Sequence, residues 1–405
     1  MPSQISQNLS VNMNTGVTGP EAGSGSDKAA VQLADAKDIS PYNAEIDAAL
    51  KIFQEWKLPG PPAASAKTFP LPTLGPVLRD AAKDLHDGPG FVLLRGFPAE
   101  KYSNEDIMTI FLGIGSHIGS QRGSQNKARN VISHITDAKE WQNVPAEKRH
   151  GIHTNSALPF HNDMGCEILT LLYRQVAASG GATSLASAAA IYNDLLKQPE
   201  VLETLKKADW SVQLSSKPPR FQPMPLLAEH NGHIIISADP GRLGLHPKTG
   251  EKPSDTDNRL TEAQTHALEV LNSLAEKHAL SVPAQAGDIL LINNLAFLHK
   301  RDSYVDDDEA VANGKDEGTT NGKTEVTANG DAATKRRWLM RLWLRNKDLS
   351  WGVPESMKTP WEAAYGTEFG RFIEEKYDPT PQPDYKVPRY TSGTAAWLME
   401  DDEEA

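Results

Sequence analysis

The segment LPFHNDMGCEI, residues 158–168, places a histidine and an aspartate two positions apart between apolar residues. Alternate side chains of an extended chain point to the same side, so His161 and Asp163 would share a face, with Asn162 opposite. One imidazole nitrogen and one carboxylate oxygen are two of the three ligands in the 2-His-1-carboxylate site that binds Fe(II). An isolated His-x-Asp also arises by chance, although a carboxylate buried in an apolar strand needs a partner or a cation. A third ligand would separate the two interpretations.

The third candidate ligand is His299, which ends the apolar stretch AGDILLINNLAFLHKR, residues 286–301. This stretch is long and apolar enough to be a strong strand candidate. Two strands of one barrel would bring His299 next to His161 and Asp163. The sequence therefore predicts a metal site built from two distant segments.

Two arginines follow in RRWLMRLWLRN, residues 336–346. Arg337 and Arg341 are four positions apart, so in a strand both lie on one face. A guanidinium group keeps its charge and is costly to bury unless it meets an anion. Two arginines pointing inward beside a metal predict an anion-binding pocket. The alternative is a pair of salt bridges on an exposed face.

The remaining patterns indicate a mainly β protein with flanking helices. Apolar residues at helical spacing predict helices in two N-terminal segments, and a Gly-Gly turn at 180–181 precedes a short strand and a further helix. Short strands separated by turns are typical of an antiparallel barrel or sandwich. The predicted helical segments are 44–58 and 104–119, and the predicted strands lie in 90–98, 167–177, 286–301 and 336–346.

Composition narrows the classes of function. The 405 residues are 39% hydrophobic and carry a net charge of −12, which disfavours non-specific binding to nucleic acid or to an anionic membrane. No apolar run reaches the roughly 20 residues that cross a bilayer. The single cysteine, Cys166, excludes an internal disulfide and fits a reducing compartment. With no signal-peptide pattern in the first thirty residues, we expect a cytoplasmic protein.

Domain organisation follows from local composition. Residues 1–40 are rich in Ser, Asn, Gly and Thr, and we expect them to be disordered. One domain should span 41–378, with a mobile insertion at about 305–334 that has hardly any apolar residue to anchor it. Residues 379–405 form a Pro-rich and then acidic tail.

These elements together resemble the TauD/TfdA family of Fe(II)- and 2-oxoglutarate-dependent dioxygenases, particularly its fungal members. The resemblance implies a double-stranded β-helix (jelly-roll, cupin-like) core, with Fe(II), 2-oxoglutarate and O2 as cofactor and cosubstrates. It also implies that His161, Asp163 and His299 are the iron ligands. The matching segments, in chain order, are GFVLLRGFP, TNSALPFHND, SGGATSLAS, GDILLINNLAFLHKR and RRWLMR.

The same resemblance assigns the cosubstrate and substrate residues. Arg337 corresponds to the arginine that binds the distal carboxylate of 2-oxoglutarate, and Thr183 to the threonine that hydrogen-bonds it. Arg341 corresponds to a position that holds an anionic group of the substrate in some members. From the residues alone, Asn155, and Asn293 or Asn294, are candidates to reach into the pocket, since asparagine is disfavoured in strands; turn or edge positions are the alternative.

The expected reaction is the oxidation of an unactivated C–H bond of a small anionic molecule, such as an amino acid, another carboxylate or a sulfonate. Hydroxylation, desaturation and ring closure all remain open, and succinate and CO2 are released. Specialised metabolism is the expected setting, with no nucleic-acid or membrane partner; a homo-oligomer is left open. The alternatives are an oxygenase acting on a protein and a catalytically silent jelly-roll binding protein.

Overall fold

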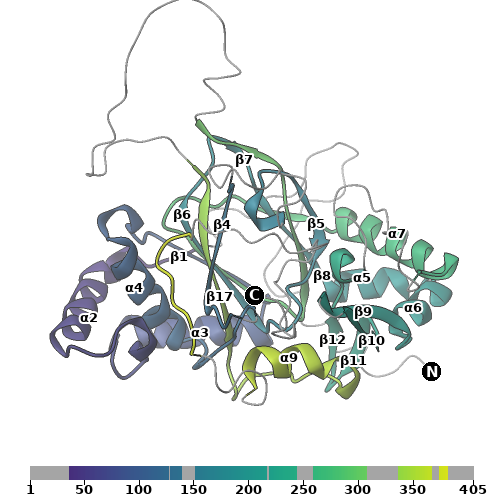
Figure 1. The fold of residues 1–405 in the computed structure, drawn as a ribbon, viewed down its shortest axis with the longest axis horizontal. Coiled ribbons are helices and arrows are strands. Elements are labelled where there is room, and N and C mark those ends of the chain that lie inside the picture. The colour runs from purple at the N-terminus through teal and green to yellow at the C-terminus, as the bar shows by residue number, and fades with distance from the viewer. Residues whose placement is uncertain are drawn as a thin grey trace, which may run out of the picture.

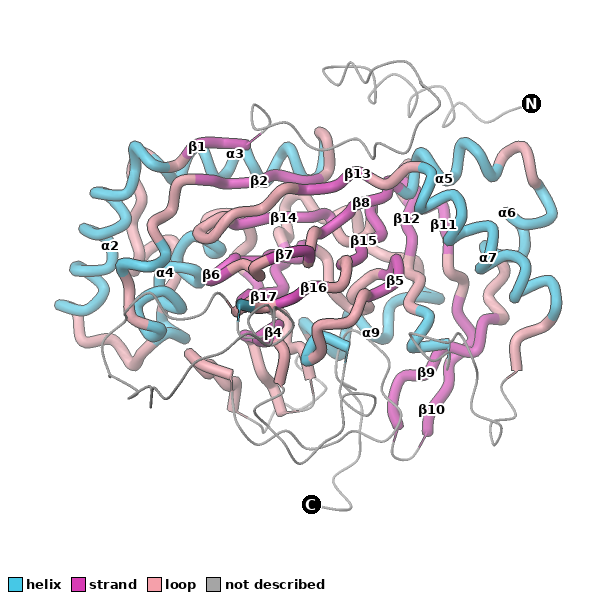
Figure 2. Tube along the Cα trace, turned by 90° about the horizontal axis from the view of Figure 1, so that it is seen from above, coloured by secondary structure: helices cyan, strands magenta, loops and turns pink. Residues whose placement is uncertain are grey.

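Two β-sheets lie between two groups of helices (Figures 1 and 2). Helices α2, α3 and α4 flank the larger sheet, and helices α5, α6 and α7 lie at the opposite side, beyond the smaller sheet. The architecture comes from a computed structural model, which describes residues 36–126, 128–138, 151–216, 219–243, 259–307, 336–366 and 374–381.

The larger sheet has the strand order β1-β2-β14-β6-β17-β3, and β4 also pairs with β17. β1 is parallel to β2, and the other neighbours are antiparallel. The strands are β1 (Ala36–Asp38), β2 (Phe91–Arg95), β3 (Gln121–Arg122), β4 (Ile132–Thr136), β6 (Ile168–Gln175), β14 (Ile289–Asn293) and β17 (Trp338–Arg345).

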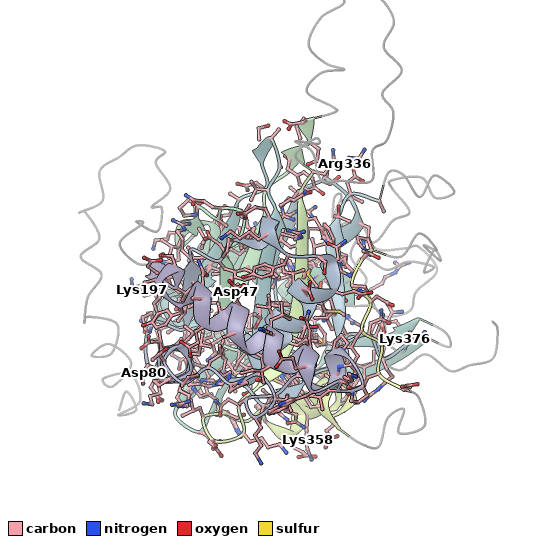
Figure 3. All side chains as sticks on the ribbon, turned by 90° about the vertical axis from the view of Figure 1, so that its left-hand side faces the viewer. Asp47, Asp80, Lys197, Arg336, Lys358 and Lys376 are labelled. Carbon is pink, nitrogen blue, oxygen red and sulfur yellow. The ribbon has the colours of Figure 1, made fainter. Side chains whose placement is uncertain are left out.

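Both faces of the larger sheet are buried, which explains its long apolar strands. In β14, Leu290 and Ile292 join the core between the sheets, whereas Ile289 and Leu291 pack in the core that contains the N-terminal helices. Figure 3, which labels Asp47 of α2, shows these helices in front of the sheet. They are α2 (Asn43–Glu55), α3 (Leu74–Asp87) and α4 (Asn104–Ser116). The α4 helix begins where the Ser103 hydroxyl accepts a hydrogen bond from the Asp106 amide, which caps its first turn.

The smaller sheet has the order β13-β8-β15-β5 and carries the predicted metal ligands. Its strands are β5 (Leu158–His161), β8 (Thr183–Ser187), β13 (Leu280–Val282) and β15 (Phe297–Arg301). In β15, His299 lies opposite His161 of β5 and opposite Leu185 of β8. Directly opposed residues share a face of a sheet, so the two histidines point to the same side.

Helices and short hairpins complete the fold around the smaller sheet. The helices are α5 (Ala188–Leu195), α6 (Pro199–Lys206), α7 (Glu262–Lys277) and α9 (Lys358–Tyr365). The short antiparallel pairs are β7 (Ser179–Gly180) with β16 (Tyr304–Val305), β9 (Trp210–Ser216) with β10 (Pro219–Met224), and β11 (Leu227–His230) with β12 (His233–Ile236).

The structure corrects two boundaries of the sequence analysis. The apolar stretch 286–301 is two strands, β14 and β15, which lie in different sheets, because the chain turns between Asn293 and Phe297. Residues 36–40, expected to be disordered, include β1, which pairs with β2, and the fully buried Ile39. Residues 1–35, most of the expected insertion (308–335) and residues 382–405 of the tail lie outside the described part of the chain.

Candidate active site

The three predicted ligands converge at one place between the sheets. His161 is the last residue of β5, Asp163 lies two residues beyond that strand, and His299 lies in β15. The Nε2 atoms of both histidines are 3.9 Å from Asp163 Oδ1, and the two imidazole rings are 4.2 Å apart between centroids. All three side chains are buried. Among the described residues, this is the one group of three His, Cys, Asp or Glu whose ligand atoms lie within 4.8 Å of one another.

Both histidines direct their Nε2 atoms at this centre. His161 Nδ1 lies 2.7 Å from the carbonyl oxygen of Pro159, which only accepts, so Nδ1 is the donor in this contact. Burial, and then the neighbouring His161, lower the pKa of His299 to about 3. His299 is therefore neutral at physiological pH, as a metal ligand must be.

The two carboxylate oxygens of Asp163 have different surroundings. Its Oδ2 accepts hydrogen bonds from Arg341 Nη1 at 2.9 Å and from Trp343 Nε1 at 3.1 Å. Its Oδ1, which faces the two histidines, has no hydrogen-bond partner among the described residues. Burial opposes ionisation of this carboxyl, but its neighbours, foremost the positive charge of Arg341, outweigh it, so the pKa of Asp163 is lowered. The result is a buried carboxylate with one oxygen directed at the centre.

Two asparagines hold the backbone around Asp163. Asn294 Oδ1 accepts from the Asp163 amide at 3.1 Å, and its Nδ2 donates to the carbonyls of Asp163 and Cys166. Asn162 donates to the carbonyls of Asn294 and Phe297 and accepts from the amide of Ala238. Asn294 is a candidate from the sequence, whereas Asn162 is expected from the sequence only to point to the opposite face from His161 and Asp163. The signal that could have found Asn162 is an uncharged amide between two candidate ligands in a buried segment, because such an amide needs hydrogen-bond partners.

A buried cation marks a second part of the site. Arg337 is 3% exposed, and its Nη1 has no hydrogen-bond partner among the described residues. The guanidinium packs beside Gly181, where an added Cβ would lie 3.0 Å from Arg337 Nε, and its Cζ is 5.3 Å from the centre of the Tyr304 ring. Gly181 has a φ of +72°, so both conformation and space favour glycine here.

The other predicted residues lie close by. Thr183, the first residue of β8, is buried, and its hydroxyl lies 2.8 Å from that of Tyr173. Arg341 is 3% exposed and also donates from Nε to Gln125 Oε1 at 2.7 Å. The burial of both arginines excludes the exposed-face alternative. Asn155 lies before β5, and its carbonyl accepts from the Tyr304 amide at 3.0 Å. Asn293 points away, donating to the carbonyl of Leu85 in α3.

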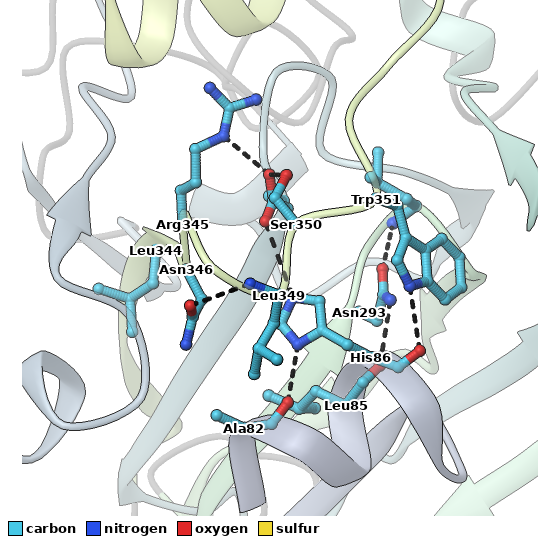
Figure 4. Close-up of polar contacts among 12 residues, drawn as sticks. Ala82, Leu85, His86, Asn293, Leu344, Arg345, Asn346, Leu349, Ser350 and Trp351 are labelled. Carbon is cyan, nitrogen blue, oxygen red and sulfur yellow. Dashed lines mark hydrogen bonds and ion pairs between the residues drawn. The ribbon is translucent and has the colours of Figure 1, made fainter. Parts of the chain in front are cut away.

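A second buried carboxylate lies four residues after Asp163. Glu167 Oε2 accepts from Arg345 Nε and from Ser350 Oγ, both at 2.8 Å. Its Oε1 lies 3.7 Å from His86 Nε2, and the other ring nitrogen of His86 donates to the carbonyl of Ala82. Figure 4 shows Arg345, Ser350 and His86 converging from β17, the following loop and α3. One imidazole and one carboxylate do not make a metal triad.

The donor set of the first centre fits ferrous iron. Two imidazole nitrogens and one carboxylate oxygen are the facial ligands of non-haem Fe(II) oxygenases. The unpartnered Asp163 Oδ1 and the two converging Nε2 atoms are what such an ion requires. The buried Arg337 supplies a positive charge for an anion in the same interior. A metal-dependent oxidation with an anionic cosubstrate is the chemistry that this arrangement can perform.

Comparisons with known proteins agree with this chemistry. Residues 57–314 match the model of the family described as taurine catabolism dioxygenase TauD, TfdA family. The chain is 34% identical over 349 residues to the taurine hydroxylase-like protein SAT17 of Stachybotrys chartarum, covering 84% of this chain and 82% of that protein. It is 26% identical over 257 residues to FR-33289 synthase of Streptomyces rubellomurinus, covering 60% of this chain and 71% of that protein.

The fold is also similar to that of a solved oxygenase. An asparagine oxygenase in complex with Fe(II), 3-hydroxyasparagine and succinate has a TM-score of 0.52 at 13% identity, covering 76% of this chain and 93% of that one. The expected jelly-roll core with flanking helices is thereby confirmed. Within the described residues, none of the helices has the length and apolar character needed to cross a membrane.

Proposed function

Because this chain belongs to the TauD/TfdA family of non-haem iron oxygenases that depend on 2-oxoglutarate, we propose that it oxidises a C–H bond of a small anionic molecule. The family assignment, the enzyme class and the iron and 2-oxoglutarate expected from the sequence are confirmed. With both bound, the site supplies oxidation by O2, with succinate and CO2 as coproducts. The substrate, the type of product and the residues in each role belong to the proposal.

His161, Asp163 and His299 would hold the iron, and the observation that supports this best is their geometry. Two imidazole nitrogens face an oxygen of the Asp163 carboxylate that has no hydrogen-bond partner among the described residues. The supporting hydrogen bonds to Pro159 and Arg341 fix the direction of the first two ligands. Such outer contacts orient metal ligands and raise affinity.

Arg337 and Thr183 would bind the distal carboxylate of 2-oxoglutarate. The buried Arg337 has no acceptor for its Nη1 among the described residues. Burying such a charge is costly unless an anion accepts a hydrogen bond from it. Thr183 belongs to the smaller sheet, like His161 and His299, and its hydroxyl meets that of Tyr173 in the larger sheet. A dicarboxylate held here by charge at one end would be oriented toward the metal at the other.

Arg341 and Asn155 are the proposed substrate contacts. Arg341 already donates to Asp163 and Gln125, so a substrate carboxylate or sulfonate that reaches it would lie next to the metal carboxylate. An amino acid, another carboxylate or a sulfonate carries such a group. The relatives described as a taurine hydroxylase-like protein and an asparagine oxygenase are consistent with this class.

The test is a substrate screen with matched neutral compounds. Protein loaded anaerobically with Fe(II) and 2-oxoglutarate is exposed to O2 and to amino acids, other carboxylates or sulfonates, and succinate release is measured. We expect an anionic compound to stimulate release, its amide or ester to stimulate it far less, and His161→Ala to abolish it. Stimulation by neutral analogues alone would contradict the anionic class, and bound iron without any stimulation by small molecules would favour a protein substrate.

A further inference from the structure

Arg301 is a further buried arginine, and it lies in the smaller sheet, on the same face as His299. It follows His299 by two residues in β15, so both side chains point to the same face, and it is 5% exposed. Its Nη2 donates to the carbonyl of Thr154 at 2.8 Å and also to that of Ser156. Its Nε and Nη1 have no hydrogen-bond partner among the described residues. One edge of this guanidinium is thus satisfied, and the rest is left without an acceptor.

Arg301 lies in the same neighbourhood as Arg337. The Cζ atoms of Arg301 and Arg337 are 5.1 Å and 5.3 Å from the centre of one ring, that of Tyr304. Arg301 is also the register partner of Thr183, so their side chains are adjacent on one face. Tyr304 OH and Arg337 Nη1 likewise have no hydrogen-bond partner among the described residues. Three side chains around the Tyr304 ring, those of Arg301, Arg337 and Tyr304 itself, thus carry polar atoms that have no hydrogen-bond partner among the described residues.

No carboxylate in the described part of the chain forms an ion pair with either guanidinium at 4.0 Å or less. Asp306 accepts from the Arg337 backbone amide, and Asp137 exerts only a longer-range attraction on Arg301. Two close buried cations repel each other, and each also pays for desolvation. An external anion that accepts from both would relieve both costs.

We propose that Arg301 binds the distal carboxylate of 2-oxoglutarate jointly with Arg337, so that the cosubstrate pocket carries two positive charges instead of one. This inference rests on the proposed function. Since the same guanidinium donates to the carbonyls of Thr154 and Ser156, it also joins the bound carboxylate to the segment that leads into His161. Arg301 is a cosubstrate-binding residue, and its contacts with the 151–156 segment are a positioning role.

The alternative is that Arg301 only ties the 151–156 segment to β15. The two roles predict different effects of an Arg301 substitution on the binding of dicarboxylates. A purely structural arginine affects stability, whereas a binding arginine also affects affinity for dicarboxylates in the absence of iron. Lys300 provides a matched control, because it is the next residue of the same strand but points to the other face and pairs with Glu276.

The experiment measures binding of 2-oxoglutarate and of glutarate, which lacks the metal-chelating keto group, to the metal-free protein by calorimetry. We expect Arg301→Met to weaken both ligands by roughly tenfold to a hundredfold, as for one charge-assisted hydrogen bond. Arg337→Met should do the same or more, and Lys300→Met should leave binding unchanged. Arg301→Lys should recover part of the loss, since it keeps the charge without the planar fork.

Steady-state kinetics of the iron-loaded protein cover the case in which glutarate binds too weakly or Arg301→Met does not fold. Arg301→Lys is then expected to raise the KM for 2-oxoglutarate with little change in kcat. Wild-type affinity or KM in a variant whose melting temperature alone is lowered would overturn the inference and leave the proposed function intact. If the iron-loaded wild type neither binds 2-oxoglutarate nor releases succinate, the proposed function fails first.

Discussion

Asp163 and Glu167 are two buried carboxylates four residues apart, and each pairs with an arginine of β17, Arg341 and Arg345 respectively. Each also keeps one oxygen without a hydrogen-bond partner in the described structure. At Asp163 that oxygen faces two imidazole nitrogens at 3.9 Å, whereas at Glu167 it faces one at 3.7 Å.

The two carboxylates differ in how many candidate ligand atoms lie on one side of them. A lone carboxylate–arginine pair neutralises charge, and Glu167 adds the hydroxyl of Ser350 and the His86 ring, which connect the loop after β17 and helix α3 to the start of β6 (Figure 4). Three ligand atoms on one side are needed to hold an ion and leave other positions open. We therefore expect the pair at Glu167 to act on stability and the pair at Asp163 to act on metal binding.

The largest expected effect is a loss of Fe(II) affinity when the carboxylate of Asp163 is replaced by an amide of the same shape, with the same change at Glu167 as the comparison. Asp163→Asn should weaken Fe(II) binding by more than about 100-fold, because losing even a contact that only supports a ligand costs about 10- to 100-fold. Glu167→Gln should leave metal affinity within about threefold of wild type and lower the free energy of unfolding by about 1–3 kcal/mol. Anaerobic metal titration measures the Fe(II) affinity, and urea unfolding measures the free energy of unfolding. Equal loss of metal in both variants would remove the distinction.

A smaller effect on metal affinity is expected from Asn294, which directly follows β14. Asn294→Ala removes three hydrogen bonds to the Asp163–Cys166 backbone, and should weaken Fe(II) binding by about 10- to 100-fold. Asn293→Ala is the matched control, because that amide is equally buried but bonds to the carbonyl of Leu85 and the amide of Leu295. Both variants should lose stability, and only Asn294→Ala should lose affinity for Fe(II). Equal loss of Fe(II) affinity in both variants, or a loss in Asn293→Ala alone, would show that the hydrogen bonds of Asn294 do not position Asp163.

The smallest expected effect is a pH dependence of stability. Burial lowers the pKa of His134 to about 4, and of His153 and His299 to about 3. Because the unfolded chain takes up protons near pH 6.5 and the folded chain does not, stability falls as pH drops below 6.5. Each histidine should contribute roughly 0.7 kcal/mol of loss between pH 7 and pH 6.

Adding Fe(II) to the same unfolding measurement tests the metal ligands as well as the histidines. Fe(II) should stabilise wild type and Glu167→Gln at pH 7, and less at pH 6 because protons compete for the ligands, while Asp163→Asn should show no metal-induced gain. Urea unfolding at the two pH values, with and without the metal, measures both effects. Stability that rises on going from pH 7 to pH 6 would contradict the neutral state of the three histidines.

The chemically unusual residues were predictable from local sequence. A histidine and an aspartate within an apolar segment, and arginines within an apolar strand, are costly to bury without partners, so their presence indicated a metal and an anion. The strands 167–177 and 336–346 and the helices near residues 44–58 and 104–119 followed from apolar periodicity.

Local sequence was thus enough to indicate the candidate side chains for the chemistry and most of the strands and helices, because spacing and side-chain type act locally. The three-dimensional structure was needed to show that 286–301 splits between two sheets, that Arg341 pairs with Asp163, and that Arg301 lies near Arg337 around Tyr304. Those facts depend on strand register and on contacts between residues far apart in the chain. Periodicity shows which side of a strand a residue occupies, but it does not show what lies opposite.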